Sequence, residues 1–249
     1  MPLVAVVTPY YNAEKFLSAY CTSLISQTFK DFSVYIFDDN SSDFGCSFIK
    51  QTLRKNKIET FIEKSNRNVG PGEGRECLIN RILTKDFKYV AFLDADDRWD
   101  GNKLEVQLDI MKKNLSNFSA TLSNRPTKLS GRCYYNITLD SLFTQREVCL
   151  SSVIISTDLL KVVKSKYGYL FRGRHAEDYR LWINAFQLMK APIILNQKYT
   201  LYVSHDRQIS KHKIIQAINV FKLYREICEK KTELILYFTK YVINKIFSA

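Results

Sequence analysis

The chain has 249 residues, enough for one large α/β domain or two small ones, and its 46% hydrophobic content excludes an intrinsically disordered protein. Lys and Arg outnumber Asp and Glu by 37 to 25, a net charge of +12, which favours anionic partners such as phosphate-bearing substrates, acidic lipids or nucleic acid. No apolar run reaches the roughly 18 residues needed to span a membrane, and no basic segment precedes the first apolar run, so we expect neither a membrane-spanning helix nor a signal peptide.

The first 100 residues alternate between short apolar runs and amphipathic segments. The runs cover residues 3–8, 32–37, 58–62 and 89–93, and continuous apolar runs are typical of strands buried on both faces of a parallel sheet. Between them, apolar residues recur at helical spacing, and Asn12 is expected to cap the first helix. This alternation predicts a doubly wound, Rossmann-like and mostly parallel sheet, in which ligands bind at the carboxyl ends of the strands.

Residues 101–210 are expected to form a smaller mixed region against that sheet. The expected elements are, in order, a helix over 104–113, strands over 118–122 and 151–155, a short helix from Thr157, a longer helix from Arg174 to about Lys190, and two strands over 192–195 and 199–203. The intervening residues 124–150 are less regular.

Residues 211–249 form a basic tail with helical periodicity. The tail contains eight lysines and arginines but only three glutamates, and large apolar residues recur among them. A basic amphipathic helix of this kind can lie in the interface of an anionic membrane. The alternative is a helix packed on the domain or in a homodimer interface. We therefore expect one domain over 1–210, with a nucleotide-sugar half (1–100) and an acceptor half (101–210), followed by this tail.

Acidic residues follow two of the predicted strands. Asp38-Asp39 follows the strand over 32–37, and Asp94-Ala95-Asp96-Asp97 follows the strand over 89–93. Side chains two apart in an extended chain point the same way, so Asp94 and Asp96 would repel each other unless a cation lay between them. Oxygen ligands suit Mg²⁺ or Mn²⁺. The alternative is a solvated acidic turn without a metal.

A third acidic pair, Glu177-Asp178, begins the predicted helix after Arg174. The dipole of a helix favours the ionised form of a carboxyl group at its N-terminus, and an ionised, positioned carboxylate can act as a general base. The alternative is the ordinary preference for acidic residues in the first turn of a helix.

Taken together and in this order, these segments resemble the family 2 glycosyltransferases, inverting enzymes of the GT-A fold that use nucleotide-diphospho-sugars. The matching segments are Val6-Val7-Thr8-Pro9-Tyr10-Tyr11-Asn12 for the opening strand and turn, Asp38-Asp39-Asn40-Ser41 for the "DDGS" motif, Asp94-Ala95-Asp96 for the "DxD" motif, and Glu177-Asp178-Tyr179-Arg180-Leu181-Trp182 for the "EDxxLW" motif. The resemblance runs from Leu3 to about Ser210. Asn40 stands where the family has glycine, and asparagine tolerates the turn conformations that glycine supplies.

The resemblance implies a role for each of these residues. The donor would be bound by Thr8, Pro9, Tyr11, Asp39, Arg75, Asp94, Ala95 and Asp96. Asp96 and His205 would hold a Mn²⁺ or Mg²⁺ ion. Asp178 would deprotonate the acceptor hydroxyl, with Glu177 and Trp182 on the acceptor side.

The implied activity is metal-dependent transfer of one hexosyl or N-acetylhexosaminyl group from a nucleotide-diphospho-sugar, with UDP as the expected nucleotide, to a hydroxyl of a glycan or lipid-linked acceptor. The implied setting is bacterial lipopolysaccharide, O-antigen or capsule synthesis at the cytoplasmic face of the inner membrane. Six cysteines without a C-x-x-C pair agree with a reducing compartment. No nucleic-acid-binding motif is recognised, so we expect no nucleic-acid partner.

Two alternatives belong to other classes. One is a sugar nucleotidyltransferase, which would share the sheet and the metal. The other is a different nucleotide-binding α/β protein such as a dehydrogenase, because Gly70-Pro71-Gly72-Glu73-Gly74 is glycine-rich before a helix, although it lacks the full G-x-G-x-x-G pattern.

Overall fold

The computed structural model describes residues 2–124, 134–136, 138–145, 148–172, 176–189, 192–203, 213–228 and 230–247. Its strands are β1 (Val4–Tyr10), β2 (Phe32–Asp38), β3 (Thr60–Lys64), β4 (Tyr89–Phe92), β5 (Arg98–Trp99), β6 (Phe118–Ser123), β7 (Tyr134–Asn136), β8 (Ile154–Ser156) and β9 (Ile193–Leu201). Its α-helices are α1 (Leu17–Ile25), α2 (Gly45–Lys55), α3 (Pro71–Ile82), α4 (Lys103–Lys113), α5 (Leu139–Gln145), α6 (Thr157–Tyr167), α7 (Glu177–Phe186), α8 (Lys213–Ile227) and α9 (Lys231–Phe247).

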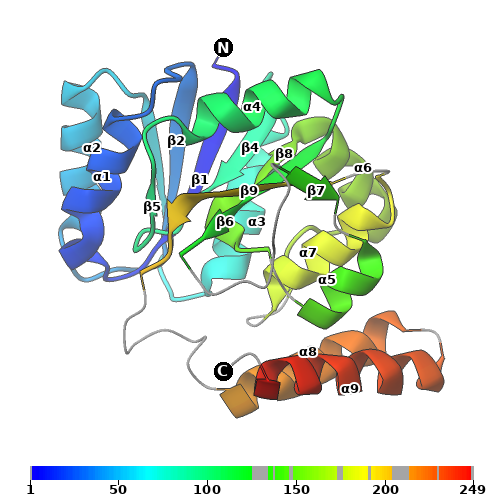
Figure 1. Ribbon diagram of the computed structural model, residues 1–249. Helices are drawn as coiled ribbons and strands as arrows, with labels where there is room; N and C mark the ends of the chain where they lie inside the picture. Colours follow the sequence, from blue (N-terminus) through cyan, green and yellow to red (C-terminus); the bar gives the residue numbers. More distant parts are fainter. Residues whose placement is uncertain are drawn as a thin grey trace.

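All of these strands join one sheet in the order β3-β2-β1-β4-β8-β6-β9-β5, with β7 paired to β9 (Figure 1). Strands β3, β2, β1 and β4 are parallel to one another, which confirms the predicted α/β class and the parallel first half. Residues of β1 alternate between two cores: Val4 and Val6 pack with α1, α2 and α4, whereas Ala5 and Val7 pack with α3, α6 and α7. Burial on both faces explains why the run is continuously apolar.

The second half of the sheet is mixed, because β8 lies antiparallel between β4 and β6 and β9 runs parallel to β6. The two strands expected over 192–195 and 199–203 are one strand, β9. Its pairing with β6 shifts register on either side of Leu122. This irregularity accommodates the polar residues between the two predicted strands within one continuous strand. The strand expected over 151–155 begins later, at Ile154, after a 3-10 turn over Leu150–Ser152.

The helix after β1 begins differently from the prediction. A 3-10 turn over Glu14–Phe16 precedes α1, and Asn12 does not cap it. Asn12 has a left-handed φ of 46°, and its Oδ1 accepts a hydrogen bond of 2.9 Å from the backbone N–H of Ser42. The side chain is therefore used to hold the acidic loop after β2, which competes with local capping.

The glycine-rich start of α3 is set by close packing and by backbone conformation. A Cβ on Gly74 would lie 2.6 Å from the ring of Phe37, so α3 approaches β2 more closely than any other residue would allow. Gly70, which precedes α3, has φ 93°, a conformation that glycine adopts without strain. Helix–sheet packing at Gly74 and the backbone conformation at Gly70 account for these two glycines without a dinucleotide.

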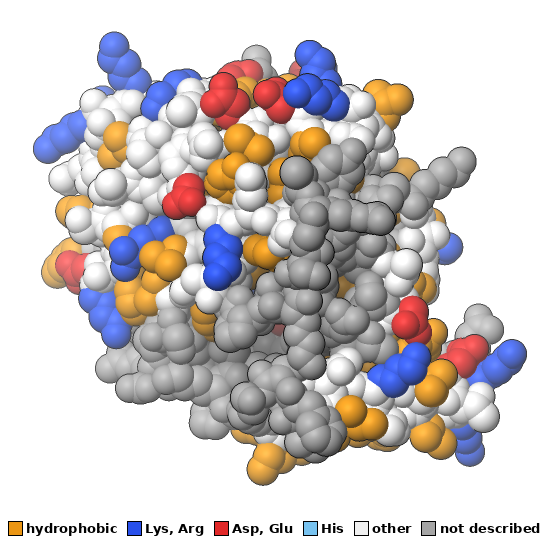
Figure 2. All heavy atoms as spheres, in the orientation of Figure 1, with side chains coloured by type: hydrophobic (Ala, Val, Ile, Leu, Met, Phe, Trp, Pro, Cys, Tyr) orange, Lys and Arg blue, Asp and Glu red, His pale blue; other side chains and the backbone are white. Residues whose placement is uncertain are grey.

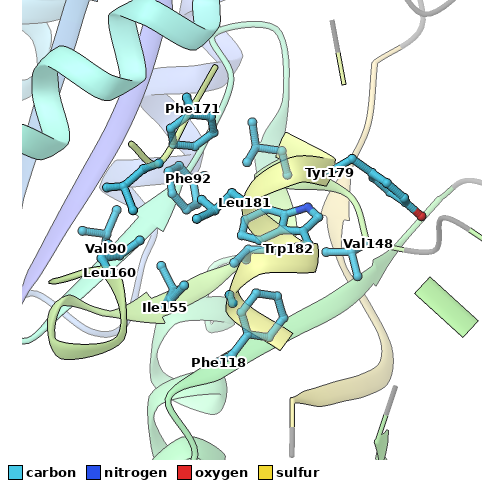
Figure 3. Close-up of a cluster of buried hydrophobic side chains, with 14 of the residues drawn as sticks. Val90, Phe92, Phe118, Val148, Ile155, Leu160, Phe171, Tyr179, Leu181 and Trp182 are labelled. Atoms are coloured by element: carbon cyan, nitrogen blue, oxygen red, sulfur yellow. The ribbon is translucent and has the colours of Figure 1, made fainter. Parts of the chain in front are cut away.

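The core on the α7 side of the sheet is rich in aromatic rings. Trp182 is fully buried, and its ring packs edge-to-face with Phe92 at 5.9 Å and Phe118 at 5.3 Å between ring centroids (Figure 3). Edge-to-face pairs add about 0.5–1.5 kcal/mol each to the gain from burial. This packing fixes α7 against β4 and β6, and so fixes the acidic pair with which α7 begins.

Helices α8 and α9 form a hairpin that packs beneath α5 and α7 (Figure 1). Val220, Leu223, Tyr224 and Tyr241 are buried in the same core as α7, and the Tyr224 hydroxyl donates a hydrogen bond to the carbonyl of Phe143 in α5. Among the described residues, no helix is both long enough and apolar enough to cross a membrane.

Candidate active site

The carboxyl ends of β1, β2 and β4 bring the predicted motifs to one edge of the sheet. The register pairs Pro9 with Phe37 and Val7 with Phe92, so the residues that follow each strand emerge side by side. A hydrogen bond of 3.1 Å from the Leu93 N–H to the Val7 carbonyl continues the β1–β4 pairing to the start of the Asp94 loop. The topology thus places both predicted acidic segments at the carboxyl edge of the parallel strands, where ligands bind in sheets of this kind.

Asp39 is 3% exposed and holds the loop that precedes α3. One carboxylate oxygen accepts a hydrogen bond from the Val69 N–H at 2.7 Å, and the other accepts one from the Gly70 N–H at 2.9 Å. A carboxylate at a helix N-terminus is stabilised by the helix dipole and by N–H groups that lack an intrahelical partner. Asn40, the next residue, has φ 63°, which confirms the turn conformation expected where relatives carry glycine.

Asp94, Asp96 and Asp97 form the described acidic cluster with the geometry of a metal site. One carboxylate oxygen from each residue lies within 4.8 Å of the others. Burial raises the pKa of Asp94, and the neighbouring charge of Asp96 adds to the effect while Arg75 opposes it. Hard oxygen ligands crowded together in this way fit a divalent cation such as Mg²⁺ or Mn²⁺, because a cation would offset their repulsion.

Asp97 is only 2% exposed, and it joins three segments of the chain. Its carboxylate accepts hydrogen bonds from the Ser151 hydroxyl at 2.5 Å and from the Val203 N–H at 3.1 Å. Burial, followed by the charges of Asp94 and Asp96, raises its pKa to about 8. Asp97 therefore anchors the acidic loop from beneath, and Asp94 and Asp96 are left facing the more open side.

Ser151 was missed by sequence reasoning. Besides its bond to Asp97, its hydroxyl oxygen accepts a hydrogen bond of 3.1 Å from the Asp94 N–H, and its carbonyl accepts one of 2.6 Å from Trp99 Nε1. Three contacts from one small residue fix both ends of the acidic loop. The only sequence signal is a pair of serines before an apolar run, which many strands share.

Arg75 connects the acidic loop to helix α7. It is 3% exposed, and its guanidinium group donates one hydrogen bond to Asp94 at 2.6 Å and another to Glu177 at 3.0 Å. Two carboxylates that are 83 positions apart in the sequence thus share one buried cation. The Phe171 ring lies 5.8 Å from the guanidinium carbon and covers it.

Glu177 and Asp178 begin α7 in different environments. Burial, followed by the charge of Asp178, raises the pKa of Glu177 to about 7, although Arg75 opposes the shift. Asp178 is half-buried and accepts a 2.8 Å hydrogen bond from the Tyr179 N–H. Ala176, directly before the pair, has φ 56°, a left-handed conformation that costs a non-glycine residue roughly 1–2 kcal/mol. The surrounding packing holds this turn.

Two predicted site side chains lie in the core instead. The Thr8 hydroxyl is fully buried, 2.7 Å from the Tyr20 hydroxyl. Trp182 packs among the rings of Phe92 and Phe118 and could not reach an acceptor without leaving them. By contrast, Tyr11 is 53% exposed at the edge where β1 ends.

His205 falls outside the described residues. The site edge also has a cavity of about 440 Å³ that was not foreseen, lined by Arg67, Asn68, Val69, Glu73, Glu76, Phe171 and Arg172.

The sheet with an acidic loop at the end of β4 and a facing acidic helix start is the arrangement expected from the resemblance to GT-A glycosyltransferases. Residues 5–136 match the profile of Glycosyl transferase family 2, so the chain belongs to that family. This result confirms the resemblance and favours a glycosyltransferase over the nucleotidyltransferase and dehydrogenase alternatives.

Curated relatives match over nearly the whole chain. The chain is 25% identical over 249 residues to the UDP-Glc:alpha-D-GlcNAc-diphosphoundecaprenol beta-1,3-glucosyltransferase WfgD of Escherichia coli, an alignment that covers 97% of this chain and 92% of WfgD. It is 27% identical over 234 residues to the putative teichuronic acid biosynthesis glycosyltransferase TuaG of Bacillus subtilis, covering 91% and 88% of the two chains.

Among solved structures, residues 1–349 of S. aureus TarS in complex with UDP-GlcNAc superpose with a TM-score of 0.75 at 18% identity, covering 96% of this chain and 71% of that one. A mannosyltransferase from Pyrobaculum calidifontis in complex with GDP-Man and Mn²⁺ gives a TM-score of 0.70 at 12% identity, over 96% and 68% of the two chains. These likenesses establish a shared fold.

Proposed function

We propose that the protein is an inverting, metal-dependent glycosyltransferase that moves one hexosyl or N-acetylhexosaminyl group from a UDP-sugar to a hydroxyl of a lipid-linked glycan. The observation that carries the proposal is the buried Arg75 bridge, because it holds the Asp94 loop beside the helix that begins with Asp178. The names of WfgD and of the TarS complex, which specify UDP-Glc with a diphosphoundecaprenol acceptor and UDP-GlcNAc, support the donor and acceptor classes.

The donor would lie along the edge formed by Pro9, Tyr11, Asp39 and Asp94. Its diphosphate would meet the metal at Asp96, with Asp94 beside it. Val203 contacts Asp97, and two residues span at most about 7 Å, so the chain length allows His205 to reach the same ion. A bound divalent cation supplies positive charge for the diphosphate as the bond to the sugar breaks.

Asp178 would accept the proton of the acceptor hydroxyl. The acceptor oxygen forms a bond to the anomeric carbon on the face opposite the diphosphate, the carbon–oxygen bond to the diphosphate breaks, and UDP leaves with the bonding electrons. The anomeric centre is inverted by this single displacement. Arg75 would act as a positioning residue here, since both of its hydrogen-bonded partners flank the reacting groups.

A lipid-linked acceptor implies work at a membrane. We propose a role in bacterial surface-glycan assembly, such as lipopolysaccharide, O-antigen or capsule, at the cytoplasmic face of the inner membrane. Residues 1–100 would serve the donor, residues 101–210 the acceptor, and residues 211–249 the attachment to an anionic membrane surface.

The reaction is tested by incubating the protein with a panel of nucleotide sugars, Mn²⁺ and a soluble acceptor, and measuring nucleoside diphosphate release and product linkage. Asp178→Asn should lower the rate about 10²–10⁴-fold while donor affinity in calorimetry stays within twofold, because the side chain keeps its size and loses its basicity. A variant with an unchanged rate would remove Asp178 from the role of base.

The metal is tested by chelation and by Asp96→Ala. EDTA should abolish release, Mn²⁺ should restore it in the parent protein, and Asp96→Ala should lower the rate on the order of 10²–10³-fold. Asp109→Ala, at an acidic position on α4 outside the site, is the matched control and should behave as the parent. Full activity of Asp96→Ala would contradict the assignment.

A further inference from the structure

The hairpin of α8 and α9 is apolar on two opposite sides. One side is the buried one described above, which joins the α7 core. The other side, which we call the outer face, carries seven exposed large apolar side chains: Ile214, Ile215, Ile218 and Phe221 on α8, and Ile235, Leu236 and Ile243 on α9. Half of the fourteen exposed large hydrophobic side chains described in the protein therefore lie on these two helices.

The spacing of these residues is what places them together. Ile214, Ile218 and Phe221 follow one another at intervals of four and three on α8, and Leu236 and Ile243 are seven apart on α9. Phe221 also packs against Phe238 of α9, with 5.0 Å between ring centroids. The apolar row of α8 therefore adjoins α9, and the exposed apolar side chains of both helices belong to one packed hairpin. Core packing does not require this second apolar side, because the core is already filled by the opposite side of each helix.

Positive charge accompanies the outer face. On α8, Lys222 and Arg225 are exposed and follow Ile218 and Phe221 by four residues each. Lys230 and Lys231, at the start of α9, are also exposed. Hydrophobic side chains lie together with lysines, arginines and a few acidic side chains over the two helices at the lower right of Figure 2.

Among the described residues of the hairpin, acidic side chains offset this charge only in part. The carboxylate of Glu226 is occupied by Arg180 of α7 at 2.6 Å. Glu233 is half-buried on α9 and is not among the exposed residues. The outer face is therefore apolar and cationic, which is the chemistry that complements an anionic lipid surface.

The hairpin and the site edge lie on the same side of the molecule. In Figure 1 the N-terminus, from which β1 starts, is at the top and the hairpin is at the bottom, so the parallel strands β1 to β4 run toward the hairpin side. A surface that covered the outer face would lie near the edge where the acidic loop and α7 begin.

We propose that the outer face docks flat on an anionic bilayer through both helices, with the isoleucines among the acyl chains and with Lys222 and Arg225 among the headgroups. The biological purpose of this docking, which is to hold a lipid-linked acceptor near Asp178, rests on the proposed function. It differs from a single amphipathic tail helix, because residues 213–227 contribute as much of the surface as residues 231–247.

The bilayer fits this face better than a second protein copy does. Aliphatic side chains make up six of the seven apolar groups, and cationic side chains lie among them rather than at a distant rim. Two copies that met through this face would bring Lys222 and Arg225 of each into a shared apolar interface, where like charges are costly.

The test measures co-sedimentation of the full chain with vesicles of phosphatidylcholine alone and of phosphatidylcholine mixed with phosphatidylglycerol. The parent protein should bind the mixed vesicles. Ile218→Glu/Ile235→Glu, with one change on each helix, should bind them at least tenfold more weakly. The matched control is Leu115→Glu/Val162→Glu, which introduces the same two charges at exposed apolar positions elsewhere and should bind as the parent.

Two further variants separate the contributions. Lys222→Gln/Arg225→Gln should lose the preference for phosphatidylglycerol. Ile214→Glu, on α8 alone, should weaken binding severalfold, whereas a tail-helix anchor would leave it unaffected. Thermal unfolding of each variant verifies that the hairpin is still folded. Equal binding by parent and Ile218→Glu/Ile235→Glu would overturn the proposal, and so would a parent dimer that this variant dissociates without any change in vesicle binding.

The proposed function and the proposed docking surface can be contradicted independently of each other. Transfer to a water-soluble acceptor should be unchanged in Ile218→Glu/Ile235→Glu, because none of its changes touches the site. A parent protein that binds vesicles and transfers no sugar would contradict the proposed function and leave the docking surface intact. A parent protein that transfers sugar and ignores vesicles would contradict the docking surface alone.

Discussion

The site edge and the α8–α9 hairpin are held in place by different forces. At the site edge, charged groups are buried: Arg75 is 3% exposed, and Asp39 and Asp97 are equally inaccessible. At the hairpin, charged groups are solvated and the buried contacts are apolar, from Val220 and Tyr224. A buried charge fixes geometry because it is costly to leave unpaired, whereas an apolar contact tolerates small shifts. The edge is therefore built for precise positioning and the hairpin for attachment.

The largest expected effect comes from breaking a buried ion pair. Arg75→Met should lower the free energy of unfolding by about 3–5 kcal/mol, because Asp94 and Glu177 would be left in the interior without a counter-charge. Urea denaturation followed by circular dichroism measures the change. The control is Arg81→Met, which removes a partly exposed pair with Glu63 at 3.1 Å and should cost less than about 1 kcal/mol. Equal losses of unfolding free energy in Arg75→Met and Arg81→Met would contradict the expected difference between the buried and the partly exposed ion pair.

A smaller effect is expected in the pH dependence of stability. The pKa of Glu177 is about 7 in the folded protein against 4.5 for the ordinary group, so the folded state holds this proton more tightly than the unfolded chain does. Its contribution to stability is complete below pH 4.5 and is lost as the pH rises to about 7.

Glu177→Gln, which cannot ionise, tests this sign. Relative to the variant, the parent protein should lose at most about 1.4 kcal/mol per pH unit within that window. Urea midpoints at several pH values in EDTA measure the difference. A parent that gained stability relative to the variant on going from pH 5 to 7 would show that the carboxylate is stabilised by Arg75 more than it is destabilised by burial.

The smallest effect is expected where the two regions meet. Glu226→Gln removes the ion pair that joins α8 to Arg180 of α7, and because Glu226 is 53% exposed the cost should be below about 1 kcal/mol. Lys240→Gln, which removes a longer pair with Asp140 at 3.4 Å whose two side chains are about half exposed, should cost nothing measurable. Hydrogen exchange in α8 that rises sharply for Glu226→Gln would mean that charge, rather than apolar packing, holds the hairpin.

The parallel first half of the sheet could be predicted because its signals are local. A continuous apolar run such as residues 3–8 has few interpretations other than a strand buried on both faces, and the residues that follow it must then lie at the carboxyl edge. The left-handed turn at Asn40 was predictable for the same reason, since the residue type itself carries the conformational preference.

The remaining features depend on contacts between distant segments. Nothing near Ser151 or Val203 indicates that both will bind Asp97, because that requires knowing that β8 and β9 join the sheet. Trp182 belongs to a recognisable motif, yet its position in the core is decided by Phe92 and Phe118. The tail was expected to contact a membrane, the domain or a second copy of the chain. One apolar side packs on the domain, and the opposite side leaves a surface for a further partner.

Strand β9 has a consequence for how the molecule opens. It pairs with β6 along nearly its whole length, with β7 near its start and with β5 near its end. Two residues after its last residue, Leu201, the N–H of Val203 donates a hydrogen bond to Asp97. One strand therefore links the acidic loop to the mixed half of the sheet. In native-state hydrogen exchange, amides of β5, β6 and β9 should open together as one cooperative unit. The site would then unfold only when the mixed half of the sheet unfolds as a whole.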